Sequence, residues 1–234
     1  MSQDKVIVFI VEGFSDKETL DGILTELFDE KSIVFSIVDG DITTQNSTKV
    51  DNIRSKIGKC IDKAMQKDKF LNTNIDMIVH LIDTDGAYIP DSNIIENKNI
   101  DILYNDSTIE TENVDNIINR NHKKRTIVNI LSTMQSINKG RIRIPYYMFY
   151  MSCNLEHVLH NIKNATQEEK NSLAEDIEDR YIENPSEFVN FMTESDFSVK
   201  GEYKDTWDFI KQDINSICRY SNFGLFFEIS NPKN

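Results

Sequence analysis

The sequence lacks the features that mark disulfide-rich, zinc-binding and membrane proteins. Its three cysteines, Cys60, Cys153 and Cys218, are odd in number and far apart, and none belongs to a C-x-x-C pair. No apolar run reaches the roughly 18 residues that a membrane-spanning helix needs. The opening segment MSQDK lacks the basic and then apolar layout of a signal peptide. These absences predict a cytoplasmic protein with reduced cysteines and no membrane segment.

Glycine and proline are also scarce, and acidic residues outnumber basic ones. The 234 residues include 8 glycines and 4 prolines, and the hydrophobic fraction of 39% suits a globular core. The 39 acidic residues exceed the 26 basic ones, for a formal net charge of −13. Non-specific binding of nucleic acid depends on neutralising phosphates, so this charge disfavours a broad basic surface. It is compatible with a local basic patch and with acids gathered around a divalent metal.

The first part of the chain alternates between two hydrophobic patterns. Continuous apolar runs indicate buried strands at residues 6–11, 32–38 and 76–82. Helical spacing of apolar residues occupies residues 15–30 and 49–66, between these strands. This order predicts an α/β fold, in which helices cover both faces of an open, mainly parallel sheet.

The rest of the chain continues this fold and then becomes mainly helical. Residues 86–110 have weak periodicity and are expected to form a loop insertion. A fourth strand is predicted at residues 142–151, and helices are predicted at residues 113–137, 154–162, 167–183 and 206–218. We therefore expect an α/β domain over residues 1–163, with a helical C-terminal elaboration over residues 164–234 packed on it.

Five acidic residues follow the predicted strands. Glu12 comes directly after the first strand and Asp16 lies early in the next helix, in KVIVFIVEGFSDKETL. Asp83 and Asp85 follow the third strand in LIDTDG, and Glu156 follows the fourth in SCNLEHVL. Ligands of open α/β sheets bind at the carboxyl ends of the strands. If the strands are neighbours, these carboxylates converge.

Converging carboxylates need a counter-charge, because close ionised acids repel one another. A set of oxygen ligands without histidine or cysteine selects hard cations such as Mg²⁺ or Mn²⁺. Two such ions can activate a water and orient a phosphodiester. Taken singly, each acid also has a simpler interpretation, as a solvated strand end, a first-turn acid or a turn residue. The combination favours a metal site.

The paired motifs VEGFSDKETL and LIDTDG resemble those of the Toprim domain, which occurs in topoisomerases, primases and the OLD (overcoming lysogenization defect) nucleases. The first motif is most similar to the OLD branch, and SCNLEHVL is similar to the acid-bearing helix start of stand-alone Toprim proteins of phage defence. The resemblance covers about residues 5–160. It implies a divalent-metal-dependent nuclease that acts as a defence or toxin effector, and it leaves open whether the substrate is DNA, tRNA or another RNA.

The resemblance also implies roles for the acids. Glu12, Asp83 and Asp85 would be catalytic and would bind the metal, with Asp16 and Glu156 completing a site for two ions. OLD enzymes carry an ATPase domain before the Toprim domain, but no P-loop G-x-x-x-x-G-K-S/T occurs here. A separate partner ATPase is therefore expected, and a homo-oligomer is compatible with the sequence.

Basic residues are harder to assign. Some OLD-type sites use a lysine near the metals, for which Lys200 and Lys204 are the candidates, although an ordinary surface position is the favoured interpretation for both. Two basic clusters, RNHKKR and KGRIR, are candidate nucleic-acid contacts, although a solvated surface is as good an interpretation for the first. The candidate residues are Arg120, Lys123, Lys124, Arg125, Arg141 and Arg143.

Two alternatives stay open. LIDTDGAY also resembles the D-x-D-G motif of haloacid-dehalogenase-type phosphatases, with Asp83 as nucleophile and Asp85 as general acid. That motif normally follows the first strand of the fold, and this alternative leaves Glu12 and Asp16 unexplained. A non-catalytic Toprim-like module that binds a partner or nucleotide is the other alternative, which the acidic composition and the missing ATPase favour.

Overall fold

The computed structural model describes residues 5–28, 31–38, 40–230 and 232 and has an α/β architecture. Its central sheet has the strand order β2-β1-β3-β8-β7. Strands β1 (Lys5–Val11), β2 (Lys31–Ile37), β3 (Ile75–Asp83) and β8 (Ile142–Met151) are parallel, whereas β7 (Ser136–Lys139) is antiparallel to β8. The predicted fold class is confirmed, and β7 is an edge strand that the sequence patterns did not reveal.

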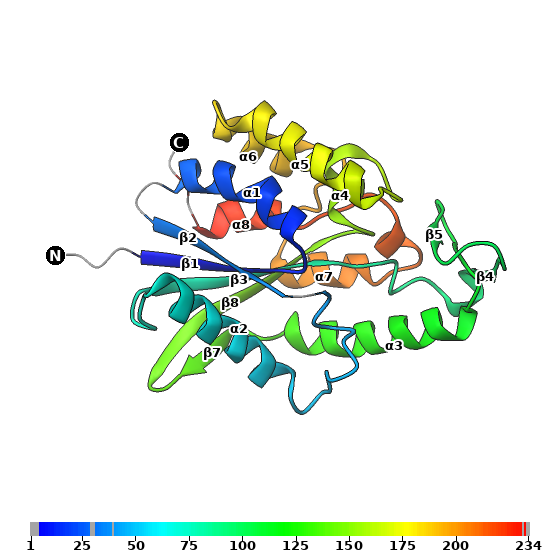
Figure 1. Cartoon of the computed structure of the whole chain (residues 1–234), viewed down its shortest axis with the longest axis horizontal. Coiled ribbons are helices and arrows are strands. Elements are labelled where there is room, and N and C mark those ends of the chain that lie inside the picture. Colours follow the sequence, from blue (N-terminus) through cyan, green and yellow to red (C-terminus); the bar gives the residue numbers. More distant parts are fainter. Residues whose placement is uncertain (1–4, 29–30, 39, 231, 233–234) are drawn as a thin grey trace.

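Helices cover both faces of this sheet, because its inner strands are apolar on both sides (Figure 1). One face carries α1 (Phe14–Leu27), α4 (Leu155–His160), α5 (Gln167–Tyr181), α6 (Pro185–Glu194) and α8 (Gly224–Ser230). The other face carries α2 (Ile53–Asp68), α3 (Val114–Leu131) and α7 (Tyr203–Ile210).

The C-terminal helices complete the core on both faces. Phe9 of β1 stacks on Phe35 with ring centroids 5.2 Å apart and meets Phe226 of α8 edge-on at 5.2 Å. On the opposite face, Trp207 of α7 packs edge-on against Tyr150 of β8 at 5.1 Å. Helices α7 and α8, which follow residue 163, therefore pack against the sheet.

The segment 86–110, expected to be a loop, contributes most of a small second sheet. After a short 3-10 helix (Asp91–Asn93), strands β4 (Ile94–Glu96), β5 (Leu103–Tyr104) and β6 (Ile109–Thr111) pair in the order β4-β6-β5. These strands are too short to show a hydrophobic period, which explains why the sequence did not predict them.

Several predicted helix limits also change. The helix expected at 206–218 ends at Ile210 and is followed by a 3-10 turn, Asn215–Ile217. Helix α6 was not predicted. Residues 29–30, at the end of the first predicted helix, lie outside the described residues. Within the described chain, no helix combines the length and apolarity needed to cross a membrane.

Candidate active site

The strands that carry the predicted acids are neighbours, because β3 lies between β1 and β8. Glu12 follows β1, and its Oε1 accepts a hydrogen bond of 3.3 Å from the backbone N–H of Asp83, the last residue of β3. Asp16 lies in the first turn of α1 and accepts from the backbone N–H of Gly13 at 2.8 Å. The parallel order of the strands thus brings these carboxylates to one edge of the sheet.

The turn after β3 aims Asp85 into the same space. Asp85 and Gly86 both adopt the left-handed conformation, with φ of 51° and 64°. The Thr84 hydroxyl fixes this turn, because it donates to the carbonyl of Ser216 at 2.6 Å and accepts from the backbone N–H of Cys153 at 2.8 Å. An aspartate with a left-handed backbone is uncommon, and the two hydrogen bonds of Thr84 hold the turn that contains it.

A buried lysine lies among three carboxylates. Lys124 of α3 is 0% exposed, and its ammonium pairs with Asp85, with Asp41 at 3.0 Å and with Glu12 at 3.8 Å. The sequence placed Lys124 among the candidate nucleic-acid contacts, whereas the structure buries it among these three acids. Its position on α3, which packs on the sheet, turns the side chain inward to the carboxylates.

Asp41 is a member of the cluster that the sequence analysis missed. It follows β2, and its carboxylate accepts hydrogen bonds from the backbone N–H of Thr43 at 2.7 Å and from the Thr43 hydroxyl at 2.6 Å. Although burial acts to raise its pKa, the charge of Lys124 and these hydrogen bonds outweigh burial and lower it. The signal was available, because Asp41 also follows the carboxyl end of a strand.

A second lysine, Lys170, pairs with the buried acid Glu156. Glu156, at the start of α4, is buried, and its Oε2 lies 3.0 Å from the ammonium of Lys170 on α5. Asn154 caps α4 by accepting from the backbone N–H of His157 at 2.8 Å, which fixes the position of Glu156. Lys170 was not predicted, because α5 lies outside the motifs.

We define the carboxylate cluster as the six acids Glu12, Asp16, Asp41, Asp83, Asp85 and Glu156, with the two lysines Lys124 and Lys170 between them.

Burial and mutual repulsion favour the protonated form of three of these acids. Burial raises the pKa of Glu12 and of Asp83 well above the ordinary values, and neighbouring carboxylates add to the effect. Burial, reinforced by Glu156, raises the pKa of Asp16 to about 6. The pKa of Lys124 moves well above its ordinary value, because the surrounding acids outweigh the effect of burial. Two lysines therefore do not neutralise the whole cluster.

The donor atoms suit a hard divalent cation. All six acids offer carboxylate oxygens, and among the described residues no donor contacts the Asp83 carboxylate. In the same part of the chain, no three acidic, histidine or cysteine side chains form a ready-made metal cage. The lysine ammonium groups are the cations that the acids contact. Glu12, Asp16, Asp83, Asp85 and Glu156 have the chemistry to hold Mg²⁺ or Mn²⁺, and the carboxylates would have to draw together around it.

The insertion contacts one side of the carboxylate cluster. The Tyr104 hydroxyl lies 3.4 Å from Asp85 Oδ1 and accepts from Arg120 at 3.0 Å. Arg120 also donates to the backbone carbonyl of Asp85 at 2.9 Å. The prediction that Arg120 contacts nucleic acid does not fit this arrangement, because its guanidinium is engaged inside the protein.

The remaining predicted cations lie elsewhere. Lys123 donates to the carbonyl of Gln45 at 2.7 Å, and Arg125 pairs with Asp91 at 2.7 Å. Arg141 and Arg143 are exposed near the turn between β7 and β8. Lys123 and Arg125 thus contact other parts of the protein, whereas Arg141 and Arg143 are open to solvent.

Lys200, the predicted catalytic lysine, lies apart from the carboxylate cluster. It is 63% exposed and pairs with Glu194 at 2.7 Å. Among the described residues it makes no contact with a cluster acid, so the structure does not support its predicted role. Lys124 and Lys170 are the lysines in that position.

Comparisons of the chain with protein-family models, with curated proteins and with solved structures found no match.

Proposed function

We propose that the protein is a divalent-metal-dependent nuclease that hydrolyses phosphodiester bonds of DNA or RNA. The observation that carries this proposal is the convergence of Glu12, Asp83 and Asp85 at the carboxyl edge of a mainly parallel sheet. The resemblance of the two motifs to Toprim nucleases points to the same chemistry. A partner ATPase and a role in phage defence belong to this proposal and rest on that resemblance alone.

The acids would supply the ligands for the metal. Glu12, Asp83 and Asp85 would hold the first ion, and Asp16 and Glu156 would hold the second. Bound Mg²⁺ or Mn²⁺ supplies an activated water and stabilises charge on the phosphate oxygens. A proton bound to Glu12, Asp16 or Asp83 competes with the ion, because the protonated acid is a poor ligand.

Lys124 takes the place that Lys200 held in the sequence analysis. Its ammonium contacts Glu12 and Asp85, so it lies beside the acids that would bind the substrate phosphate through a metal. A fixed positive charge there is suited to the negative charge that develops on a phosphodiester under attack. In this role Lys124 is a positioning residue, since it contacts the ligands.

The test is cleavage of plasmid DNA and of tRNA by the purified chain with Mg²⁺ or Mn²⁺. Glu12→Gln and Asp83→Asn are expected to lower the cleavage rate by about 100-fold or more, because each removes a carboxyl group that would become a metal ligand when the ion displaces its proton. Lys200→Ala is the matched control and keeps the wild-type rate, because Lys200 lies outside the cluster.

The same assay separates the alternatives. Hydrolysis of an aryl phosphate that survives Glu12→Gln would identify a phosphatase that uses Asp83 and Asp85. Failure to cleave DNA and RNA with either metal, alone and with a co-encoded ATPase, would overturn the nuclease proposal. The lysine-neutralised cluster would then serve a non-catalytic binding module.

A further inference from the structure

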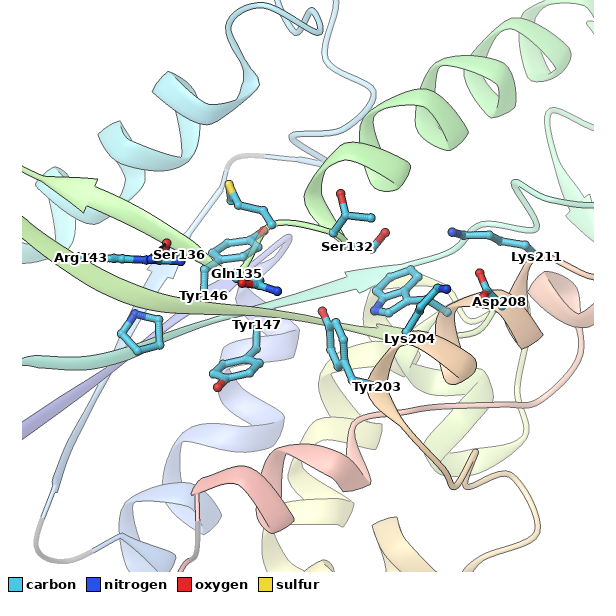
Figure 2. Close-up of a pocket in the computed structure, with 14 residues that line it drawn as sticks. Ser132, Gln135, Ser136, Arg143, Tyr146, Tyr147, Tyr203, Lys204, Asp208 and Lys211 are labelled. Atoms are coloured by element: carbon cyan, nitrogen blue, oxygen red, sulfur yellow. Dashed lines mark hydrogen bonds between the residues drawn. The ribbon is translucent and has the colours of Figure 1, made fainter.

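A pocket of about 700 Å³ lies at the edge of the sheet beside β8 (Figure 2). It is bounded by the C-terminal end of α3, the segment leading into β7, the first half of β8 and helix α7. None of the six acids of the carboxylate cluster lines it. The pocket is therefore a separate feature that the proposed nuclease chemistry does not use.

Positive charge gathers in this pocket although the chain as a whole is acidic. Arg143, Lys204 and Lys211 line it, against the one lining acid, Asp208. The chain carries a net charge of −13, so this local excess of cations runs against its composition. Figure 2 shows Arg143 at one end of the pocket and Lys204 with Lys211 at the other. An anionic group of a ligand is favoured at either end.

The walls between these cations are aromatic. Tyr147 and Tyr203 are half-buried and meet edge-on with ring centroids 6.3 Å apart, whereas Tyr146 and Trp207, which also line the pocket, are only 1% and 2% exposed. The rings are held firmly: the Tyr203 hydroxyl donates to the carbonyl of Met148 at 2.7 Å and accepts from its backbone N–H at 3.0 Å. The accessible parts of the Tyr147 and Tyr203 rings are suited to stacking on a flat heterocycle.

The same contacts exclude a peptide strand as the occupant. Where β8 extends past β7, its outer edge is unpaired and faces this region. A peptide strand added there would have to hydrogen-bond to the backbone of Met148 and Tyr150. Tyr203 and Trp207 already bond to the backbone of Met148, and Asn222 accepts from the backbone N–H of Tyr150 at 2.9 Å. The edge is occupied by side chains, so the pocket suits a small ligand.

One polar group close to the pocket is left without a partner. Ser132 lies at the end of α3 beside the pocket, and its hydroxyl has no hydrogen-bond partner among the described residues. Ser132 is only 5% exposed, and a buried hydroxyl without a partner is costly. Because this oxygen is closed to solvent, the cations and the aromatic rings are the groups that a ligand in the pocket would meet.

We propose that this pocket binds a nucleoside phosphate, with the base against Tyr147 and Tyr203 and the phosphate on Lys204 and Lys211. The ligand is either a free mononucleotide or the phosphorylated end of a nucleic-acid strand, which share this chemistry. Arg143 was predicted from the sequence to contact nucleic acid. The proposal does not depend on nuclease activity, because no cluster acid takes part.

The fluorescence of the single tryptophan can report binding in this pocket. Trp207 is the only tryptophan in the sequence and lines the pocket, so its fluorescence should change when the pocket fills. The titration uses the Glu12→Gln variant in EDTA, which removes cleavage as a complication. The probes are ribonucleoside 5′-monophosphates, adenosine, inorganic phosphate, and a single-stranded oligonucleotide with and without a 5′-phosphate.

A saturable change with a monophosphate, or with the 5′-phosphorylated oligonucleotide alone, supports the proposal and tells the two sources apart. Lys204→Ala combined with Lys211→Ala is expected to weaken this binding about tenfold or more, because charge-assisted hydrogen bonds are lost. The control pair Lys59→Ala with Lys63→Ala changes the net charge equally on exposed positions of α2 and keeps the affinity. Circular dichroism of each variant verifies the fold.

Three outcomes would overturn the proposal. The first is the lack of a saturable response to any nucleotide or oligonucleotide at millimolar concentration. The second is an equal loss of affinity in the two lysine pairs, which would indicate a general charge effect. The third is equal affinity for inorganic phosphate and for the monophosphates, which would leave the aromatic walls without a role. A loss of nuclease activity in Glu12→Gln does not affect any of these three binding measurements.

Discussion

At the scale of single residues, Lys124 and the acids around it control the balance of charge in the carboxylate cluster. Its ammonium is fully buried and pairs with Glu12, Asp41 and Asp85. Removing one partner from a buried ion pair leaves an uncompensated charge, which is far more costly than losing a surface pair.

Lys124→Met is therefore expected to lower the free energy of unfolding by about 3–5 kcal/mol. Urea denaturation in EDTA, followed by tryptophan fluorescence, measures this loss. Lys59→Met, at an exposed helix position, is the matched control and should change stability by less than about 0.5 kcal/mol. An unchanged stability in Lys124→Met would show that the three acids are neutralised in another way.

Asp16 gives the protein a specific pH dependence. Burial raises its pKa from 3.8 to about 6 in the folded protein, so between these values the carboxyl is protonated only in the folded state. The stability that this proton contributes is complete below pH 3.8 and is lost as the pH rises through 6.

Asp16→Asn cannot titrate, so it does not lose this stability. Its free energy of unfolding relative to wild type is expected to rise by on the order of 2–3 kcal/mol between pH 4 and pH 7. Denaturation of both proteins in EDTA at the two pH values measures the difference, and Asp21→Asn on the same helix is the matched control. A difference that stays constant with pH would contradict the assignment.

At the scale of elements, helices α6 and α8 pack so closely that a glycine is needed at their contact. A Cβ added to Gly224, at the start of α8, would lie 2.7 Å from the backbone carbonyl oxygen of Met192 in α6. A Cβ added to Gly58, inside α2, would have its nearest neighbour, the ammonium of Lys139, at 4.0 Å. A side chain at Gly224 would therefore clash with α6, whereas a side chain at Gly58 has room.

Gly224→Ala is expected to lower the free energy of unfolding by about 1–3 kcal/mol, because the backbone of α6 has to shift. Gly58→Ala is expected to raise it by up to about 1 kcal/mol, because alanine is the better helix former. Thermal or urea denaturation of both variants tests the pair. If both changes have the same sign, the close contact between α6 and α8 is not the cause.

At the scale of the whole molecule, the C-terminal helices and the first strands share their cores. Phe223 and Phe226 contact Phe9 on one face of the sheet, and Trp207 contacts Tyr150 on the other. A chain that ends at residue 163 would expose both cores to water. Helices α7 and α8 and Phe223 are thus a structural part of the fold.

The truncated chain 1–163 is expected not to fold, and the full chain is expected to unfold in one transition. Circular dichroism at far-ultraviolet wavelengths and Trp207 fluorescence should report the same midpoint in urea. Two separate midpoints, or a folded 1–163 fragment, would show that the C-terminal part is an independent unit.

Much of the fold and part of the cluster could be predicted from the sequence. Continuous apolar runs predicted strands close to β1, β2, β3 and β8, because buried parallel strands need apolar residues on both faces. Glu12, Asp83 and Asp85 were predicted to converge because each follows such a strand. Local patterns could not reveal β7 or the strands of the insertion, since these are too short for a period to appear.

The sequence by itself indicated the α/β fold and placed each acid after a strand, because hydrophobic period and the position of a residue along the chain are local properties. Only the tertiary structure decided which lysines neutralise those acids. Lys124 and Lys170 come from helices far along the chain, and the packing of α3 and α5 turns them inward. The tertiary structure also decided that Lys200 faces solvent and that Trp207 lines a separate pocket. Contacts between distant segments depend on how helices pack, which no local pattern records.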